Sequence, residues 1–258
     1  MQALFQLLVL LAFAAGINAS PVRADDEFVR YILGDSAITV WVMDNGAGLA
    51  FFAPHDNENT SAAATMEYVG ANGGRLVQLT HSGERNVTFT HNGETYVFDP
   101  NRMFTDTGIE ATLKLEGKTY SAEAHKMVRA FAGEVVKHVL QQVKEGQLII
   151  AVHNNTNGRY SIESYKPGGE FVKEASYVFQ SSKMDADDFF FVTTPELYLP
   201  LRKAGHNVIL QDNAGVTDDG SLSVYAAKHG IPYVNIDAQV GHTAEQVAML
   251  AILGDILQ

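Results

Sequence analysis

The stretch "GLAFFAPHDNENTSAAAT", residues 48–65, changes character in its middle. Its first half is an apolar and aromatic run typical of a buried β-strand, and Pro54 is expected to end that strand. A histidine, His55, and a glutamate, Glu58, then follow three residues apart. One tight turn would bring both side chains to a single point. The pair therefore indicates either ordinary loop polarity or two ligands of a metal ion.

Apolar runs like the one at 48–53 recur along the chain and alternate with helical patterns. Strands are predicted at 38–43, 48–53, 75–80, 147–152, 188–194, 207–211 and 232–236. Residues 86–99 predict a β-hairpin, because Asn92 and Gly93 suit the positive φ angles of its turn. This alternation predicts an α/β fold: a single domain whose mixed, mostly parallel central sheet is covered by helices on both faces.

Three segments carry helical signals. A helix at 121–146 would begin at Ser121 as its N-cap and stop at Gly146. A second is predicted at 220–229. The last, at 243–257, would open with a capping box made by Thr243 and Gln246.

Composition limits the functions that the chain can have. At 258 residues, 46% apolar and 19% charged, it suits one large globular α/β domain. A net charge of −12 leaves no basic surface to neutralise phosphates, so no nucleic-acid partner is expected. The chain has no cysteine, which excludes disulfides, thiolate metal ligands and cysteine nucleophiles. The oligomeric state is left open.

The first twenty residues, "MQALFQLLVLLAFAAGINAS", predict a signal peptide at 1–24 with cleavage after Ala19 or Ala24, although no Lys or Arg precedes the apolar run. No later stretch approaches the roughly 20 apolar residues of a membrane span. An exported, periplasmic or secreted protein is therefore predicted, without membrane attachment after cleavage. Glycosylation sequons at Asn59 and Asn154 directly follow the candidate ligands Glu58 and His153, which favours a bacterial host.

Titratable residues follow three of the predicted strands. His55 and Glu58 follow 48–53, His153 follows 147–152, and Asp237 follows 232–236. In open α/β sheets, ligands bind outside the carboxyl ends of the strands. Two histidines and one carboxylate are the ligand set of a catalytic zinc, which keeps an open position for water or substrate. The pattern predicts a Zn²⁺ site formed by His55, Glu58 and His153.

A fourth element lies in "FDPNRMF", residues 98–104. Asn101 and Arg102 are expected in a turn after the hairpin, where a rigid guanidinium can bind a carboxylate through two hydrogen bonds. The alternative is that Arg102 pairs with Asp99 or Asp106 and supports the loop.

These motifs occur in a characteristic order: H-x-x-E, then D-x-N-R-x-F, then a strand ending in histidine, then a late strand ending in an acid. Over residues 48–240 this order resembles the zinc carboxypeptidase superfamily, with its carboxypeptidase A-like peptidases and its succinylglutamate desuccinylase–aspartoacylase branch. The resemblance implies that 25–258 is a catalytic domain with His55, Glu58 and His153 as zinc ligands. It also implies that Asn101 and Arg102 hold the carboxylate of the substrate.

Two family roles have less regular matches. Asp237 falls where the family has its general-base glutamate, but aspartate is one methylene shorter. Glu245 is the alternative base, although the dipole of the final helix also explains a carboxylate there. Arg85 and Arg75 are candidates for the arginine that polarises the substrate carbonyl, and Arg85 is counted among the substrate-binding residues. Each also suits a surface charge.

The activity implied by the resemblance is hydrolysis of an amide bond next to a carboxylate-bearing end, with a small peptide as substrate. Cell-wall peptides would be accessible to an exported bacterial protein. One alternative is an N-acyl amino acid amidohydrolase of the aspartoacylase type. Another is a catalytically weak, exported peptide-binding protein on the same scaffold, which the short Asp237 and the lack of a clear polarising arginine would favour.

Overall fold

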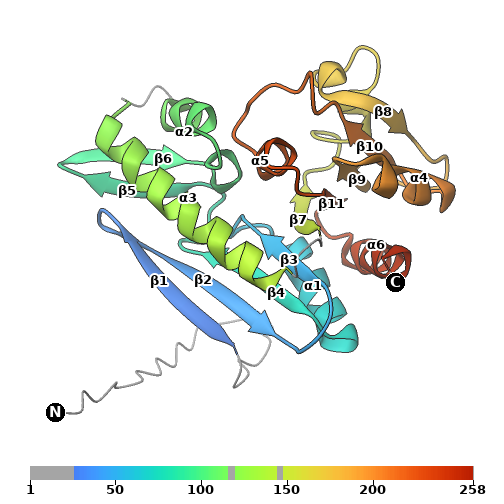
Figure 1. Ribbon diagram of the computed structural model, residues 1–258, viewed down its shortest axis with the longest axis horizontal. Helices are drawn as coiled ribbons and strands as arrows, with labels where there is room; N and C mark the ends of the chain where they lie inside the picture. Colours follow the sequence, from blue (N-terminus) through green and yellow to red (C-terminus); the bar gives the residue numbers. More distant parts are fainter. Residues whose placement is uncertain (1–25, 116–119, 144–147, 258) are drawn as a thin grey trace.

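The computed structural model describes residues 26–115, 120–143 and 148–257. The predicted signal peptide and its cleavage points lie outside these ranges, as does Gly146. Within them, nine strands form one sheet in the order β1-β2-β4-β3-β7-β11-β9-β10-β8 (Figure 1). The strands are β1 (Glu27–Leu33), β2 (Ser36–Asp44), β3 (Ala50–Ala53), β4 (Arg75–Thr80), β7 (Ile149–Asn155), β8 (Ala175–Phe179), β9 (Phe189–Val192), β10 (Val208–Gln211) and β11 (Tyr233–Gln239).

Parallel pairing is concentrated in the centre of the sheet. Strands β4, β3, β7 and β11 pair in parallel. Strands β2 and β9 flank this centre and run antiparallel to β4 and β11, respectively. Followed outward through β1, β10 and β8, the pairings leave six of the nine strands described for this sheet pointing the same way. The predicted α/β fold with a mixed, mostly parallel sheet is confirmed.

Helices cover both faces of this sheet. On one face α1 (Asn59–Asn72), α4 (Pro195–Lys203) and α6 (Thr243–Ile256) pack around a core that contains Phe51, Ile150 and Ile236. On the other face lie α2 (Asp106–Leu113), α3 (Ala122–Gln142), α5 (Leu222–Lys228) and the hairpin of β5 (Val87–His91) and β6 (Glu94–Phe98) (Figure 1). None of the helices in the described ranges combines the length and hydropathy of a membrane span.

The alternation of side chains along β7 and β11 sets the position of the site. Val152 and Ile236 point into the core beneath α1 and α6. The next residue along each strand, His153 in β7 and Asp237 in β11, points to the opposite face, because side chains alternate along a strand. The two residues are paired in the strand register. Both lie inside their strands, near the carboxyl ends, because this pairing continues to Asn155 and Gln239. The predicted strands ended three residues too early.

Two of the predicted local signals are confirmed and one is wrong. The Ser121 side chain accepts a hydrogen bond from the backbone N–H of Ala124 at the start of α3. The hairpin turn has positive φ at Asn92 (52°) and Gly93 (82°). The capping box of the last helix is absent, because Gln246 is fully buried and donates instead to the carbonyls of His153 (2.9 Å) and Ile236 (3.2 Å). Gln246 thereby ties α6 to both strands of the site.

The turn that carries Arg102 is held by close backbone packing between two glycines. A Cβ added to Gly108 would lie 2.2 Å from the Gly220 Cα and 2.6 Å from the Arg102 carbonyl oxygen. We expect Gly108→Ala to lower the free energy of unfolding by about 1–3 kcal/mol, because both contacts are with backbone. Urea unfolding measures this. The matched control is Gly133→Ala, which faces open space inside α3 and should be neutral or stabilising.

Candidate active site

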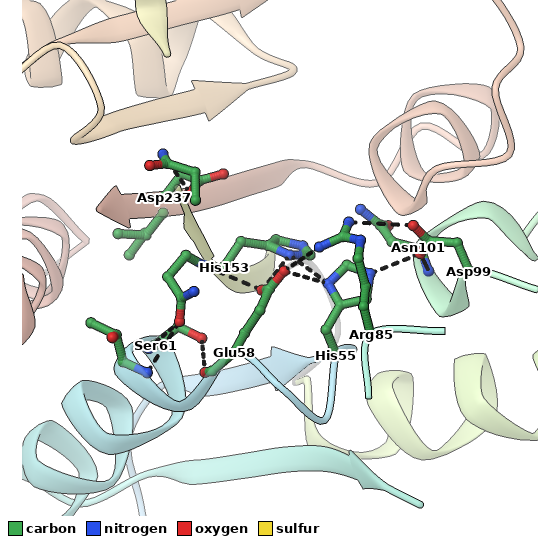
Figure 2. Close-up of polar contacts among 12 residues, drawn as sticks. His55, Glu58, Ser61, Arg85, Asp99, Asn101, His153 and Asp237 are labelled. Carbon is green, nitrogen blue, oxygen red and sulfur yellow. Dashed lines mark hydrogen bonds and ion pairs between the residues drawn. The ribbon is translucent and has the colours of Figure 1, made fainter. Parts of the chain in front are cut away.

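Three elements bring the predicted metal ligands together. His55 follows β3, and its carbonyl accepts a hydrogen bond from the Glu58 N–H (3.3 Å), which closes the turn between them. Glu58 occupies the N-cap position of α1, a helix that was not predicted. His153 projects from β7 toward both (Figure 2). The strand, the turn and the helix start thus act as one support for the first two ligands.

The donor atoms of the three residues converge on one point. The Nδ1 atom of His55 lies 2.8 Å from Glu58 Oε1 and 3.2 Å from His153 Nδ1. His153 Nδ1 lies 3.0 Å from the other oxygen, Glu58 Oε2. All three side chains are buried, and one ligand atom from each can be chosen so that all lie within 4.8 Å of one another. Two imidazole nitrogens and a carboxylate oxygen, gathered away from water, fit a bound metal ion.

Asp99 orients His55 from the side opposite Glu58. Its Oδ1 atom lies 2.8 Å from His55 Nε2 and also accepts a hydrogen bond from the Asn101 N–H at 2.7 Å. A carboxylate on the remote ring nitrogen fixes the tautomer of a ligating histidine and leaves Nδ1 free for a metal. The sequence analysis considered Asp99 only as a partner of Arg102.

Asp99→Asn tests this orienting role. The amide is the same size but carries no charge and can turn its N–H₂ group toward the ring, so we expect metal affinity to fall about 10- to 100-fold. Competition with a chelator, measured by calorimetry, gives the affinity. Unchanged affinity would mean that Asp99 only supports the turn at Pro100–Arg102 (η1).

Opposite charges in the cluster set its protonation. Burial would raise the pKa of Glu58, but the rings of His55 and His153 outweigh it and hold that pKa well below the ordinary value. Burial lowers the pKa of His153, which favours the neutral ring. Burial likewise opposes protonation of His55, but the charges of Glu58 and Asp99 outweigh it and raise its pKa. An ionised carboxylate is the form of Glu58 that binds a metal.

Arg85 lies over this cluster, whereas Arg75 does not. Arg85 Nη1 donates to Glu58 Oε1 at 2.6 Å, and Nη2 lies 3.3 Å from Asp99 Oδ2 (Figure 2). Arg75 opens β4, level with the amino end of β3 and away from the carboxyl ends that carry the site, and pairs with Asp44 at 2.8 Å. The structure therefore places one of the two candidate arginines beside the ligands.

One cavity, of about 420 Å³, gathers most of the predicted site. We call it the first cavity; its lining includes Glu58, Arg85, Asn101, Arg102, His153 and Asp237. Glu245 is not among its lining residues and is exposed in the first turn of α6. Of the two candidate bases, the structure brings only Asp237 to the cavity.

Asn101 and Arg102 enter the first cavity from the turn η1. The Asn101 Oδ1 atom accepts a hydrogen bond from the Leu222 N–H at 3.2 Å, which joins the turn to α5. Arg102 Nη2 lies 3.5 Å from Asp219 Oδ2, and both side chains are more than a third exposed. Its ion pair is thus with Asp219, and not with Asp99 or Asp106 as the alternative reading supposed. Such a long, exposed pair is weak, so the guanidinium can exchange partners.

Asp237 is a buried acid beside His153 on the neighbouring strand (Figure 2). Burial, followed by the charge of Glu58, raises its pKa well above the ordinary value, against the opposing effect of Arg85. Asn155 donates to Asp237 Oδ1 from 3.0 Å. The sequence analysis missed Asn155, although its place two residues after His153 in a strand puts both on one face.

Comparison with known proteins gives likenesses in structure alone. No protein-family model and no curated protein matches the chain. Among solved structures, one named "Putative metallopeptidase" from Shewanella baltica OS155 is 12% identical, with 88% of this chain and 85% of that chain covered and a TM-score of 0.42. A succinylglutamate desuccinylase from Vibrio parahaemolyticus is 10% identical, with 90% and 77% covered and a TM-score of 0.40. A bacteriophage poly-gamma-glutamate hydrolase is 10% identical, with 81% and 73% covered and a TM-score of 0.35.

Proposed function

We propose that the chain is a zinc-dependent hydrolase of the zinc carboxypeptidase superfamily, which cleaves an amide bond next to a carboxylate-bearing end. The observation that carries this proposal is the first cavity. In it Glu58 and His153 of the buried His–Glu–His donor set, a buried acid and a guanidinium with a weak ion pair share one space. Each of these groups alone has structural explanations, whereas together they meet the needs of amide hydrolysis.

His55, Glu58 and His153 would hold the metal. A zinc ion bound there would polarise a carbonyl group and lower the pKa of water. Asp237 would take a proton from the attacking water and pass it to the leaving amine, a role that its raised pKa supports. Arg85 would place its N–H groups toward the charge that develops on the carbonyl oxygen. Asn101 and Arg102 would fix the terminal carboxylate so that the adjacent amide is correctly positioned.

Arg102→Lys separates recognition of a chain end from hydrolysis in general. Lysine keeps the charge but lacks the planar fork that holds a carboxylate by two bonds. We expect kcat/KM for a free-acid N-acyl dipeptide to fall roughly 10- to 1,000-fold, about 1.5–4 kcal/mol, with zinc content unchanged. For the wild-type protein, amidating the carboxylate of the substrate should have a similar effect.

The control for this measurement is the amidated dipeptide with the Arg102→Lys protein. The kcat/KM for the amidated dipeptide should be little lower with Arg102→Lys than with the wild type, because this substrate already lacks the carboxylate that Arg102 would hold. If wild-type protein handles free acid and amide equally, the carboxylate-directed proposal fails even where zinc is bound. The same mixture, with N-acyl amino acids added and read by mass spectrometry, distinguishes a peptidase from an amidohydrolase of the aspartoacylase type.

A further inference from the structure

Arg85 lies on the loop that joins β4 to β5, residues 81–86, and this loop has few contacts of its own. It contains no helix or strand, and four of its six residues are exposed. Within the described ranges, no backbone–backbone hydrogen bond outside the regular strands and helices involves any of them. The proposed reaction nevertheless needs the Arg85 guanidinium at one point, so another group must hold the loop.

That group is the carboxylate of Asp56. Its Oδ2 atom accepts a hydrogen bond from the backbone N–H of His81 at 2.7 Å and a second from the backbone N–H of Gly83 at 2.6 Å. Hydrogen bonds to an ionised acceptor are shorter than neutral ones and about twice as strong. The two bonds therefore fix the backbone of the loop up to two residues before Arg85.

Asp56 directly follows the candidate ligand His55, so one turn carries both the metal site and the anchor of the loop. From the loop, Arg85 reaches back to Glu58 Oε1 at 2.6 Å and to Asp99 Oδ2 at 3.3 Å (Figure 2). Asp99 in turn bonds to His55 Nε2 at 2.8 Å. These links form a closed ring, in which Asp56 supplies the connection from the turn to the loop.

The Arg85 side chain needs this support from its backbone. The side chain is long and 46% exposed, and exposed ion pairs are individually weak. Its contacts with Glu58 and Asp99 hold the guanidinium best when the backbone that carries it does not move. A displacement of about 1 Å at a reacting centre can lower a rate about 100-fold.

Gly83 gives a second way to change the loop. Its φ angle is 77°, in the left-handed region that glycine adopts without strain. A Cβ added there would meet no atom within 4 Å, so alanine would strain the backbone without touching a neighbour. Gly83→Ala therefore loosens the loop while it leaves the Asp56 carboxylate and the metal ligands in place.

We propose that Asp56 is a positioning residue for Arg85. Through the backbone of the 81–86 loop, it sets the point at which the guanidinium meets the carbonyl oxygen of the substrate. This rests on the proposed function, because the placement matters only if charge develops on that oxygen. Asp56 is not among the residues that line the first cavity, so it acts through Arg85 and not on the substrate itself.

The first test is a double-mutant cycle on the zinc-loaded protein, with a free-acid N-acyl dipeptide as substrate. Asp56→Ala should lower kcat about 10- to 100-fold, with KM and zinc content nearly unchanged. In an Arg85→Ala background it should lower kcat less than about 2-fold, because no guanidinium is left to misplace. Asp56→Asn should restore most of the activity, since its amide oxygen can accept both backbone bonds. Gly83→Ala should lower kcat as Asp56→Ala does.

The matched control is Asp35→Ala. Asp35 Oδ1 also accepts a backbone hydrogen bond, from the Thr90 N–H at 2.6 Å, and Asp35 does not line the first cavity. This variant should lose stability and keep its kcat. An unchanged kcat in Asp56→Ala, an equal loss with and without Arg85, or a loss of zinc overturns the proposal, because the effect would then not pass through the guanidinium.

The second test does not depend on turnover. NMR of isotope-labelled arginine side chains reports how freely each guanidinium rotates, and the Arg85 signals are assigned by their absence from Arg85→Ala. Wild type and Asp35→Ala should show separate signals for Nη1 and Nη2 of Arg85, and Asp56→Ala one averaged signal. That result supports the positioning role even if no amide is cleaved, which would count against the proposed function alone. Signals that are the same in wild type and Asp56→Ala overturn the proposal.

Discussion

His153→Ala is expected to reduce bound zinc from near one ion per chain to below about 0.1, and to lower amide hydrolysis about 1,000-fold or more. The reason is that two remaining ligands cannot hold the ion. A bound zinc lowers the activation free energy of hydrolysis by several kcal/mol, and each 1.36 kcal/mol corresponds to a factor of ten in rate. Elemental analysis after dialysis measures the metal. A protein that binds no metal when refolded with excess zinc would contradict the whole assignment.

A second readout separates loss of metal from loss of fold. Zinc that binds only the folded protein should stabilise it by about 4 kcal/mol at 1,000 times the dissociation constant. Thermal unfolding of wild type should shift upward on adding zinc, while His153→Ala should not respond. The matched control is His138→Ala, which removes another buried histidine, one on α3 that is hydrogen-bonded to Tyr31 of the edge strand β1. It should lose stability and keep the zinc response.

The centre of the sheet and the candidate ligands could be predicted from the sequence for a physical reason. Buried strands read as apolar runs, and the polar residues at their carboxyl ends stand out against that background. Single strands and their order were therefore enough to single out His55, His153 and Asp237 as candidates, which the fold brings close together. The hairpin could also be predicted, because the conformation of Asn92 and Gly93 is decided locally.

What the sequence analysis missed depends on tertiary contacts. Helix α1 is Ala-rich, and its buried face includes Ser61 and Thr65 while Ala63 and Ala71 are exposed, so it lacks the apolar stripe that reveals a surface helix. Pro195 and Pro200 obscured α4. The motif at Thr243 and Gln246 satisfied a local rule, but burial of Gln246 against two strands overrode it. Likewise nothing near Arg85 in the sequence indicates Glu58 and Asp99 as its partners.

Asp237→Asn is the other change with a large expected effect. It keeps the shape of the side chain and its place beside Asn155, but removes the ability to take up a proton. We expect kcat to fall about 100- to 10,000-fold while zinc content stays unchanged. The expected pH profile follows from the raised pKa of Asp237. A base must be deprotonated, so wild-type activity should fall as the pH drops through that pKa, and Asp237→Asn should lack this limb.

Asp237→Glu then decides whether the short acid limits the reaction. The added methylene would carry the carboxylate further into the first cavity, away from Asn155, whose amide holds the aspartate at 3.0 Å. If the scaffold is catalytically poised but the base is distant, turnover should rise while substrate affinity changes little. If Asp237 is already placed for proton transfer, the longer side chain loses the bond to Asn155 and turnover should fall. A protein that only binds peptides would show no change in turnover with either Asp237→Asn or Asp237→Glu, because its function would not require proton transfer.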